Sequence, residues 1–220
     1  MSDLYHSDGF SALVDLYATY QKRERAERIA KRLFDSCGTT ERLLHESLDR
    51  LCALSGLGEC DAAFLKLCIA LDSRRRTERF RFGEIPTEQQ IKDYFIGLFL
   101  GSTEENIYLL SFDDKGRAIA CDLVAEGTIN SASVTARRLL DFAVSRCVHS
   151  VILAHNHPCG TTAASNEDLR LTGNYSGLFA SVGICLREHY IVAGEQCEGI
   201  MNSMGTELHS AFEAFENAEI

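Results

Sequence analysis

Two histidines, a serine and an aspartate lie close together in the second half of this 220-residue chain. The series begins with His155 and His157 and continues through Ser165 to Asp168. Residues 151–154 form a short apolar run that predicts a buried strand, and side chains two apart on a strand point the same way. We therefore expect both imidazoles on one face. Imidazole and carboxylate are zinc ligands, so this spacing predicts a metal site.

The end of this strand decides where the aspartate lies. Pro158 and Gly160 interrupt the strand, and Ser165 looks like the start of a helix whose first turn contains Asp168. In that position the carboxylate faces back toward the histidines. The same Ser-x-x-Asp spacing also fits a capping box, in which both side chains serve backbone amides. The sequence leaves both roles open for Asp168.

The predicted ligand set favours a catalytic over a structural metal. A catalytic zinc keeps three protein ligands and one position for water, whose pKa it lowers to about 7. A structural zinc prefers a closed set of ligands rich in thiolates. Two neighbouring imidazoles in an apolar core would otherwise need other polar partners. We therefore expect zinc bound by His155, His157 and Asp168.

Composition limits the class of protein. A chain of 220 residues with 45% hydrophobic content forms one large or two small domains, and we favour two. No apolar run approaches the 18 or more residues of a membrane span, and the N-terminus does not resemble a signal peptide. Nine cysteines without a Cys-x-x-Cys pair fit reduced thiols. We expect a cytoplasmic protein without a membrane partner.

Charge is distributed unevenly along the chain. Residues 1–83 contain fourteen Lys and Arg against thirteen Asp and Glu, whereas residues 84–220 contain eight against nineteen. The acidic half repels phosphate backbones, so any DNA contact is expected in the first half. Basic clusters occur there at Lys22, Arg23, Arg25, Arg28, Lys31, Arg32 and residues 74–76. Basic residues on helices more often form a solvated face than a binding site.

The first half of the sequence is predicted to be helical. Apolar residues recur at helical spacing over 11–34, and further helices are expected over 41–54 and 59–71. Glycines in the turn at 55–58 make the last two a helical hairpin. The polar residues 73–86 are expected to link two domains, giving a helical domain over 1–83 and a second over 84–220.

The second half alternates between helical and strand patterns. A helix follows Thr87, two strands at 107–112 and 118–124 are joined by a hairpin turn, and a helix covers 134–145. The histidine strand, a helix over 166–181 and a strand over 184–192 follow. This order predicts a mixed α/β sheet covered by helices, with the site at the carboxyl edge of a strand.

The order His-x-His, seven residues, Ser, two residues, Asp resembles the signature of JAMM metalloproteases, and its surroundings resemble the RadC subgroup. Blocks similar to RadC are Gly127-Thr128-Ile129-Asn130, Arg137, residues 152–160, Thr172 and His189-Tyr190-Ile191-Val192-x-Gly194. The helical first half is similar to the helix-hairpin-helix region that precedes the catalytic-like domain in RadC proteins.

This resemblance implies a cytidine-deaminase-like α/β fold, the JAMM fold, after a small all-helical domain. It implies one zinc with His155, His157 and Asp168 as ligands, and Ser165 stabilising a developing oxyanion. JAMM proteins also use a glutamate on an upstream strand to take a proton from water. Glu105 fits that position best, and the alternatives are Glu104 and Glu126.

Four positions depart from the RadC pattern, and none is an expected ligand: Cys159, Ala164, Thr135-Ala136 and Glu188. A catalytic cysteine at Cys159 is disfavoured, because a thiolate there would compete for zinc or remain a small loop residue. His189 has two open roles, which are support of the metal site and ordinary strand packing.

Two functions remain open from the sequence. The first is a zinc-dependent hydrolase of amide or isopeptide bonds in a peptide or protein. The second is a DNA-associated repair or mobile-element factor of the RadC type, with DNA bound by the N-terminal helical region. A variant of the first hypothesis is a non-catalytic binding module that keeps the zinc.

Overall fold

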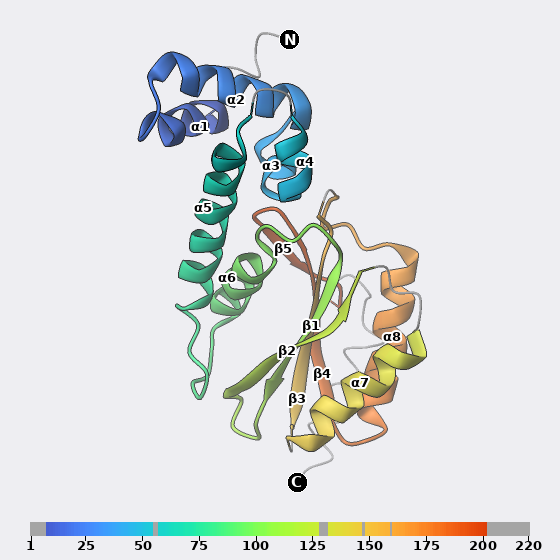
Figure 1. Cartoon of the computed structure of the whole chain (residues 1–220). Helices are drawn as coiled ribbons and strands as arrows, with labels where there is room; N and C mark the ends of the chain where they lie inside the picture. The colour runs from blue at the N-terminus through green and yellow to red at the C-terminus, as the bar shows by residue number, and fades with distance from the viewer. Residues whose placement is uncertain (1–7, 55–56, 128–131, 147, 159, 202–220) are drawn as a thin grey trace. The chain divides into compact units, whose positions relative to one another are not determined.

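Helices form the N-terminal part of the chain, and a five-stranded sheet with further helices forms the C-terminal part, in the computed structural model (Figure 1). The structure describes residues 8–54, 57–127, 132–146, 148–158 and 160–201. Residues 55–56 of the expected turn, residues 128–130 of the glycine motif and Cys159 lie outside this range. Within the described ranges, no helix is long and apolar enough to cross a membrane.

The chain divides into two units, each described by itself. The first contains the described residues up to Arg74 together with Leu100–Thr103, and the second contains Arg75–Phe99 and the described residues from Glu104 onward. Residues 75–83, which the sequence analysis assigned to the helical half, thus make most of their contacts in the second unit.

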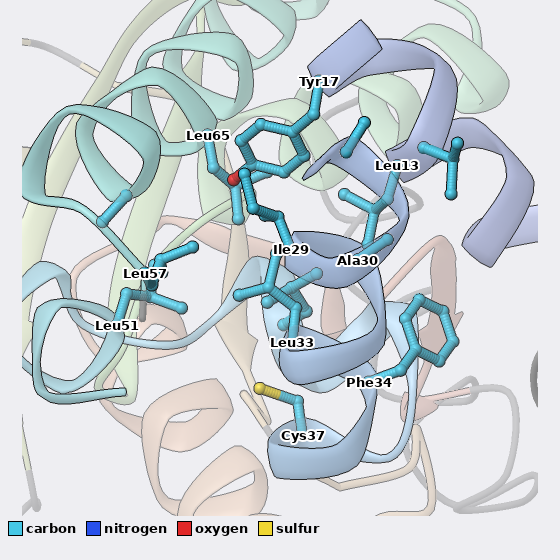
Figure 2. Close-up of a cluster of buried hydrophobic side chains, with 14 of the residues drawn as sticks. Leu13, Tyr17, Ile29, Ala30, Leu33, Phe34, Cys37, Leu51, Leu57 and Leu65 are labelled. Atoms are coloured by element: carbon cyan, nitrogen blue, oxygen red, sulfur yellow. The ribbon is translucent and has the colours of Figure 1, made fainter. Parts of the chain in front are cut away.

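The first unit is built from α1 (Asp8–Ala18), α2 (Arg23–Cys37), α3 (Thr40–Leu44), α4 (Leu48–Ala53) and most of α5 (Glu59–Thr77). Figure 2 shows its core, where Leu13 and Tyr17 of α1 meet Ile29 and Leu33 of α2, with Leu65 of α5 beside them. Tyr17 and Leu33 are fully buried. Burial of these apolar stripes holds the short helices together.

Three expectations for this half were wrong in detail. The helix expected over 11–34 is broken at 19–22, and that expected over 41–54 is two helices. The second break has a local cause, because Ser47 begins α4 by accepting a hydrogen bond from the Arg50 N–H at 3.2 Å. The linker expected from residue 73 begins later, since α5 continues to Thr77.

A buried carboxylate compensates for the first break. Asp61 at the start of α5 is 2% exposed and accepts hydrogen bonds from the Tyr20 hydroxyl at 2.8 Å and from Arg25 at 3.1 Å. The Tyr17 hydroxyl donates to the backbone carbonyl of Asp61 at 3.0 Å. Burial acts to raise the pKa of Asp61, but its hydrogen bonds outweigh that effect and lower it. These bonds compensate for the interrupted helix.

The second unit contains a mixed sheet with the strand order β2-β1-β3-β4-β5. Its strands are β1 (Asn106–Phe112), β2 (Ala118–Glu126), β3 (Ser150–Asn156), β4 (Cys185–Ala193) and β5 (Gln196–Gly199). Only β3 and β4 are parallel neighbours; the other pairs are antiparallel. The predicted mixed α/β sheet is confirmed, and β5 is a strand that the sequence analysis missed.

Helices cover both faces of this sheet (Figure 1). Helix α6 (Glu88–Phe99) packs on one face, where Phe95 and Phe99 meet Leu110 and Ile152. Helices α7 (Ala132–Ser145) and α8 (Asn166–Ala180) pack on the other face. Because β3 and β4 are parallel, α8 is the crossover between them, and its N-terminus follows the carboxyl end of β3.

Candidate metal centre

Strand β3 and helix α8 bring the three expected ligands together. His155 is in β3, and His157 directly follows the strand, where its N–H donates to the Val192 carbonyl of β4 at 2.8 Å. Asp168 is in the first turn of α8. The Nε2 atoms of the two histidines are 3.0 Å apart. Asp168 Oδ1 lies 3.2 Å from His155 Nε2, and its Oδ2 lies 3.8 Å from His157 Nε2.

Asp168 has the capping role, and in the same conformation its carboxylate faces His155. Ser165 is the N-cap of α8, and its hydroxyl accepts a hydrogen bond from the Asp168 N–H at 3.1 Å. In return, Asp168 Oδ2 accepts from the Ser165 N–H at 2.8 Å and from its hydroxyl at 2.6 Å. This leaves Oδ1 free to face His155. The capping box therefore orients the carboxylate toward the histidines.

The protonation of Asp168 fits a ligand role. Burial acts to raise the pKa of its carboxyl group, but a protonated His155 and the hydrogen bonds from the Ser165 hydroxyl and N–H outweigh burial. They hold the pKa of Asp168 well below its usual range. The carboxylate is thus charged at neutral pH, as metal binding requires.

Hydrogen-bond partners determine where each imidazole carries its proton. His157 Nδ1 lies 2.7 Å from the Thr161 carbonyl, which can only accept, so Nδ1 donates and Nε2 of the neutral ring has a lone pair. His155 Nδ1 lies 2.9 Å from His189 Nε2. His189 Nδ1 in turn lies 2.7 Å from the hydroxyl of Thr172.

His155, His189 and Thr172 form a series of hydrogen bonds, and its direction follows from Thr172. The Thr172 hydroxyl lies 2.7 Å from the Asp168 carbonyl oxygen and donates its single proton there. It must then accept from His189 Nδ1–H, which makes His189 Nε2 an acceptor for His155 Nδ1–H. A neutral His155 therefore has its lone pair on Nε2. Burial lowers the pKa of His189 well below its ordinary value, which agrees with a neutral ring.

The donor set fits a metal ion. With both rings neutral and protonated on Nδ1, two nitrogen lone pairs and a carboxylate oxygen face one another. Such a group of acceptors is repulsive unless a cation neutralises it. Among the described residues, this group is the one whose ligand atoms, all within 4.8 Å of one another, could hold a metal. Together they form a candidate metal site.

The three candidate glutamates lie near the start of β1 and the end of β2. Ile107 is paired with His155 across β1 and β3, so the two share the α7–α8 face of the sheet. Glu105 directly precedes β1, and alternation carried back from Ile107 would put its side chain on this same face. Glu126 is paired with Asn106 and so belongs to the opposite face. Glu104 has its carboxylate beside Gly127.

Asn156, between the two histidines, anchors the glutamate segment. Its side-chain N–H donates to the Glu104 carbonyl at 3.0 Å, and its side-chain oxygen accepts from the Asn106 N–H at 2.8 Å. Asn156 is 1% exposed. It thus holds the backbone on both sides of Glu105. Sequence reasoning missed this role, although strand alternation places residue 156 opposite the histidines.

Glu188 replaces the aspartate that RadC proteins have before the histidine, and it has a structural role. One of its carboxylate oxygens accepts from the His189 N–H and from the Met201 N–H, both at 2.8 Å. Burial raises the pKa of Glu188, against the effect of these hydrogen bonds. The substitution leaves the three candidate ligands in place.

Comparisons with known families and proteins agree with this geometry. The sequence profile of the RadC-like JAB domain matches residues 85–206. A UPF0758 protein of Photobacterium profundum is 31% identical over 78% of this chain and 77% of its own length. A UPF0758 protein of Chromobacterium violaceum is 32% identical over 80% of each chain, and one of Vibrio cholerae is 31% identical over 74% of each. The described sheet, the His-His-Asp site and these matches together show that this chain belongs to the RadC family and contains a RadC-like JAB domain.

Proposed function

We propose that this protein is a zinc-dependent hydrolase that cleaves an amide or isopeptide bond in a peptide or protein. The observation that carries the proposal is the convergence of His155 Nε2, His157 Nε2 and Asp168 Oδ1. Two imidazoles and one carboxylate match the open three-ligand sets of catalytic zinc. Zinc bound there supplies Lewis acidity, which polarises a carbonyl and lowers the pKa of a water molecule.

Glu105 is the proposed general base. It directly precedes β1, where strand alternation favours the face of His155, and Asn156 holds the backbone on both of its sides. An exposed carboxylate in this position accepts a proton from the attacking water and returns it to the leaving amine. Glu104 and Glu126 are less suited, since one lies beside Gly127 and the other belongs to the opposite face.

Ser165 is the proposed donor to the oxyanion that develops on the scissile carbonyl. Its hydroxyl now donates to Asp168 Oδ2, so the proton must turn toward the substrate oxygen during the reaction. Asp168 Oδ2 keeps the Ser165 N–H as a donor when this happens. Its carboxylate therefore stays oriented while the hydroxyl stabilises developing charge.

The alternative, a DNA-associated factor, has weaker support. Within the described part of the first unit, two members of the basic cluster are already paired. Arg23 contacts Asp15 at 3.4 Å, and Arg25 contacts the buried Asp61 at 3.1 Å. Phosphate contacts need free cations, so such pairing reduces what the helical unit offers to DNA. We therefore prefer the hydrolase.

Metal analysis and peptide profiling test the proposal together. Purified full-length protein is expected to contain about one zinc per chain, and His157→Ala and Asp168→Asn are expected to lose it. A peptide library derived from whole cell extracts is then incubated with wild type and with Glu105→Gln, and new termini are identified by mass spectrometry. Cleavage by wild type but not by a zinc-loaded Glu105→Gln supports the mechanism. Wild type without zinc, or equal zinc in His157→Ala, contradicts the proposal.

A further inference from the structure

We propose that His189 and Thr172 are positioning residues for the metal: they keep the proton of His155 on Nδ1 and so preset its Nε2 as a ligand. This inference rests on the metal site proposed above and goes beyond its three ligands. The sequence left two roles open for His189, support of the metal site and ordinary strand packing, and this inference favours the first.

The evidence begins with burial. His189 in β4 is 3% exposed, and Thr172 in α8 is fully buried. A buried polar ring needs partners for both nitrogens, and His189 has one on each side. One of these partners is His155, a candidate metal ligand, which distinguishes His189 from a ring that serves packing alone.

The hydrogen bonds join two ligands in a closed arrangement. The series begins at the Asp168 carbonyl, passes through Thr172 and His189, and ends at His155 Nδ1. Asp168 then meets His155 Nε2 through its own side chain at 3.2 Å. The series can run in two directions. When Thr172 donates to the Asp168 carbonyl, His155 Nε2 has a lone pair that can bind a cation, whereas the reverse direction puts a proton on Nε2, facing the Asp168 carboxylate.

The direction matters for metal binding. If His155 carried its proton on Nε2, the ring would present N–H to the ion and could not bind it. Metal-bound histidines almost always donate their other ring N–H to an oriented acceptor, and losing that acceptor typically costs 10–100-fold in affinity. Here the acceptor is a second histidine, whose own tautomer is set by Thr172.

Four variants of the full chain separate positioning from packing. His189→Leu removes the acceptor, and Thr172→Val removes the hydroxyl while keeping its shape. His189→Gln restores an acceptor of similar reach. Tyr175→Phe is the matched control, because this residue of α8 is also buried and its hydroxyl has no hydrogen-bond partner among the described residues.

Zinc affinity is measured by competition with a chelator, on folded fractions confirmed by circular dichroism. His189→Leu and Thr172→Val are expected to weaken zinc binding by about 10–100-fold. His189→Gln should recover most of the loss, and Tyr175→Phe should bind as wild type does. A wild type that binds zinc while His189→Leu and Thr172→Val bind it equally well overturns the inference and leaves the proposed function intact.

A second measurement uses the metal-free protein. Long-range ¹H–¹⁵N correlation spectra identify which nitrogen of each neutral imidazole is protonated. His155 and His189 are both expected as Nδ1–H tautomers in wild type, and His155 should become mixed in Thr172→Val. An Nε2–H tautomer of His155 in wild type would overturn the inference. This measurement tests the expected tautomer of His155 even if a variant at residue 189 does not fold or if wild type binds no zinc.

Discussion

Replacing Asn156 by alanine should loosen the segment that contains Glu105, without removing a metal ligand. The substitution deletes two hydrogen bonds, to the Asn106 N–H at 2.8 Å and to the Glu104 carbonyl at 3.0 Å. An N–H left without a partner costs about 1–3 kcal/mol, and the bond to the more exposed carbonyl contributes about 0.5–1.5 kcal/mol. The free energy of unfolding of the second unit should therefore fall by about 2–4 kcal/mol.

Amide hydrogen exchange gives the sharpest assay, because it reports on the affected backbone directly. A local loss of about 2 kcal/mol corresponds to roughly 30-fold faster exchange of the Asn106 N–H in Asn156→Ala. Asn106→Ala is the matched control: it keeps the backbone N–H and removes a side-chain oxygen that has no partner among the described residues. Equal exchange at residue 106 in wild type and Asn156→Ala would refute the reasoning.

Three further predictions follow from the described contacts. Zinc at about 100 times its dissociation constant should stabilise wild type by about 2.7 kcal/mol in thermal melts, and Asp168→Asn should lack this stabilisation; the same increase in both would contradict the ligand role. Asp61 has a lowered pKa in the folded chain, so its contribution to stability is present above its unfolded pKa of about 3.9 and is lost as pH falls through the folded value. Urea unfolding from pH 6 to 3 should show this loss in wild type and a flatter profile in Asp61→Asn. Leu33→Ala, at a fully buried position, should cost about 2–5 kcal/mol in urea unfolding. Leu67→Ala, at a position 55% exposed, should cost less than about 0.5 kcal/mol, and similar losses would argue against the described core.

The convergence of the candidate metal ligands was predictable because its signals are local. The apolar run before His155, the Pro158 interruption and the Ser165–Asp168 cap lie within one short stretch, and each reports on backbone geometry directly. The mixed sheet followed for the same reason, from alternation between strand and helix patterns. Both features depend on residues that are near one another in sequence.

The features that escaped prediction depend on contacts distant in sequence. The break after α1 is compensated by Asp61, which lies about 40 residues further along the chain. Strand β5 has four residues and is held by pairing with β4, so it has little pattern of its own. The hydrogen bond between Thr172 and His189 depends on the packing of α8 against β4, which no local sequence pattern reports.

The crossover from β3 through α8 to β4 has an evolutionary consequence. The three candidate ligands, the Ser165 cap and His189 all belong to this one segment of the chain. Such a segment can be inherited or recombined as one unit, a cassette. From the rest of the chain, the proposed site then needs mainly the segment that contains Glu105. We therefore expect divergent descendants to exchange their N-terminal helices freely while this cassette changes slowly.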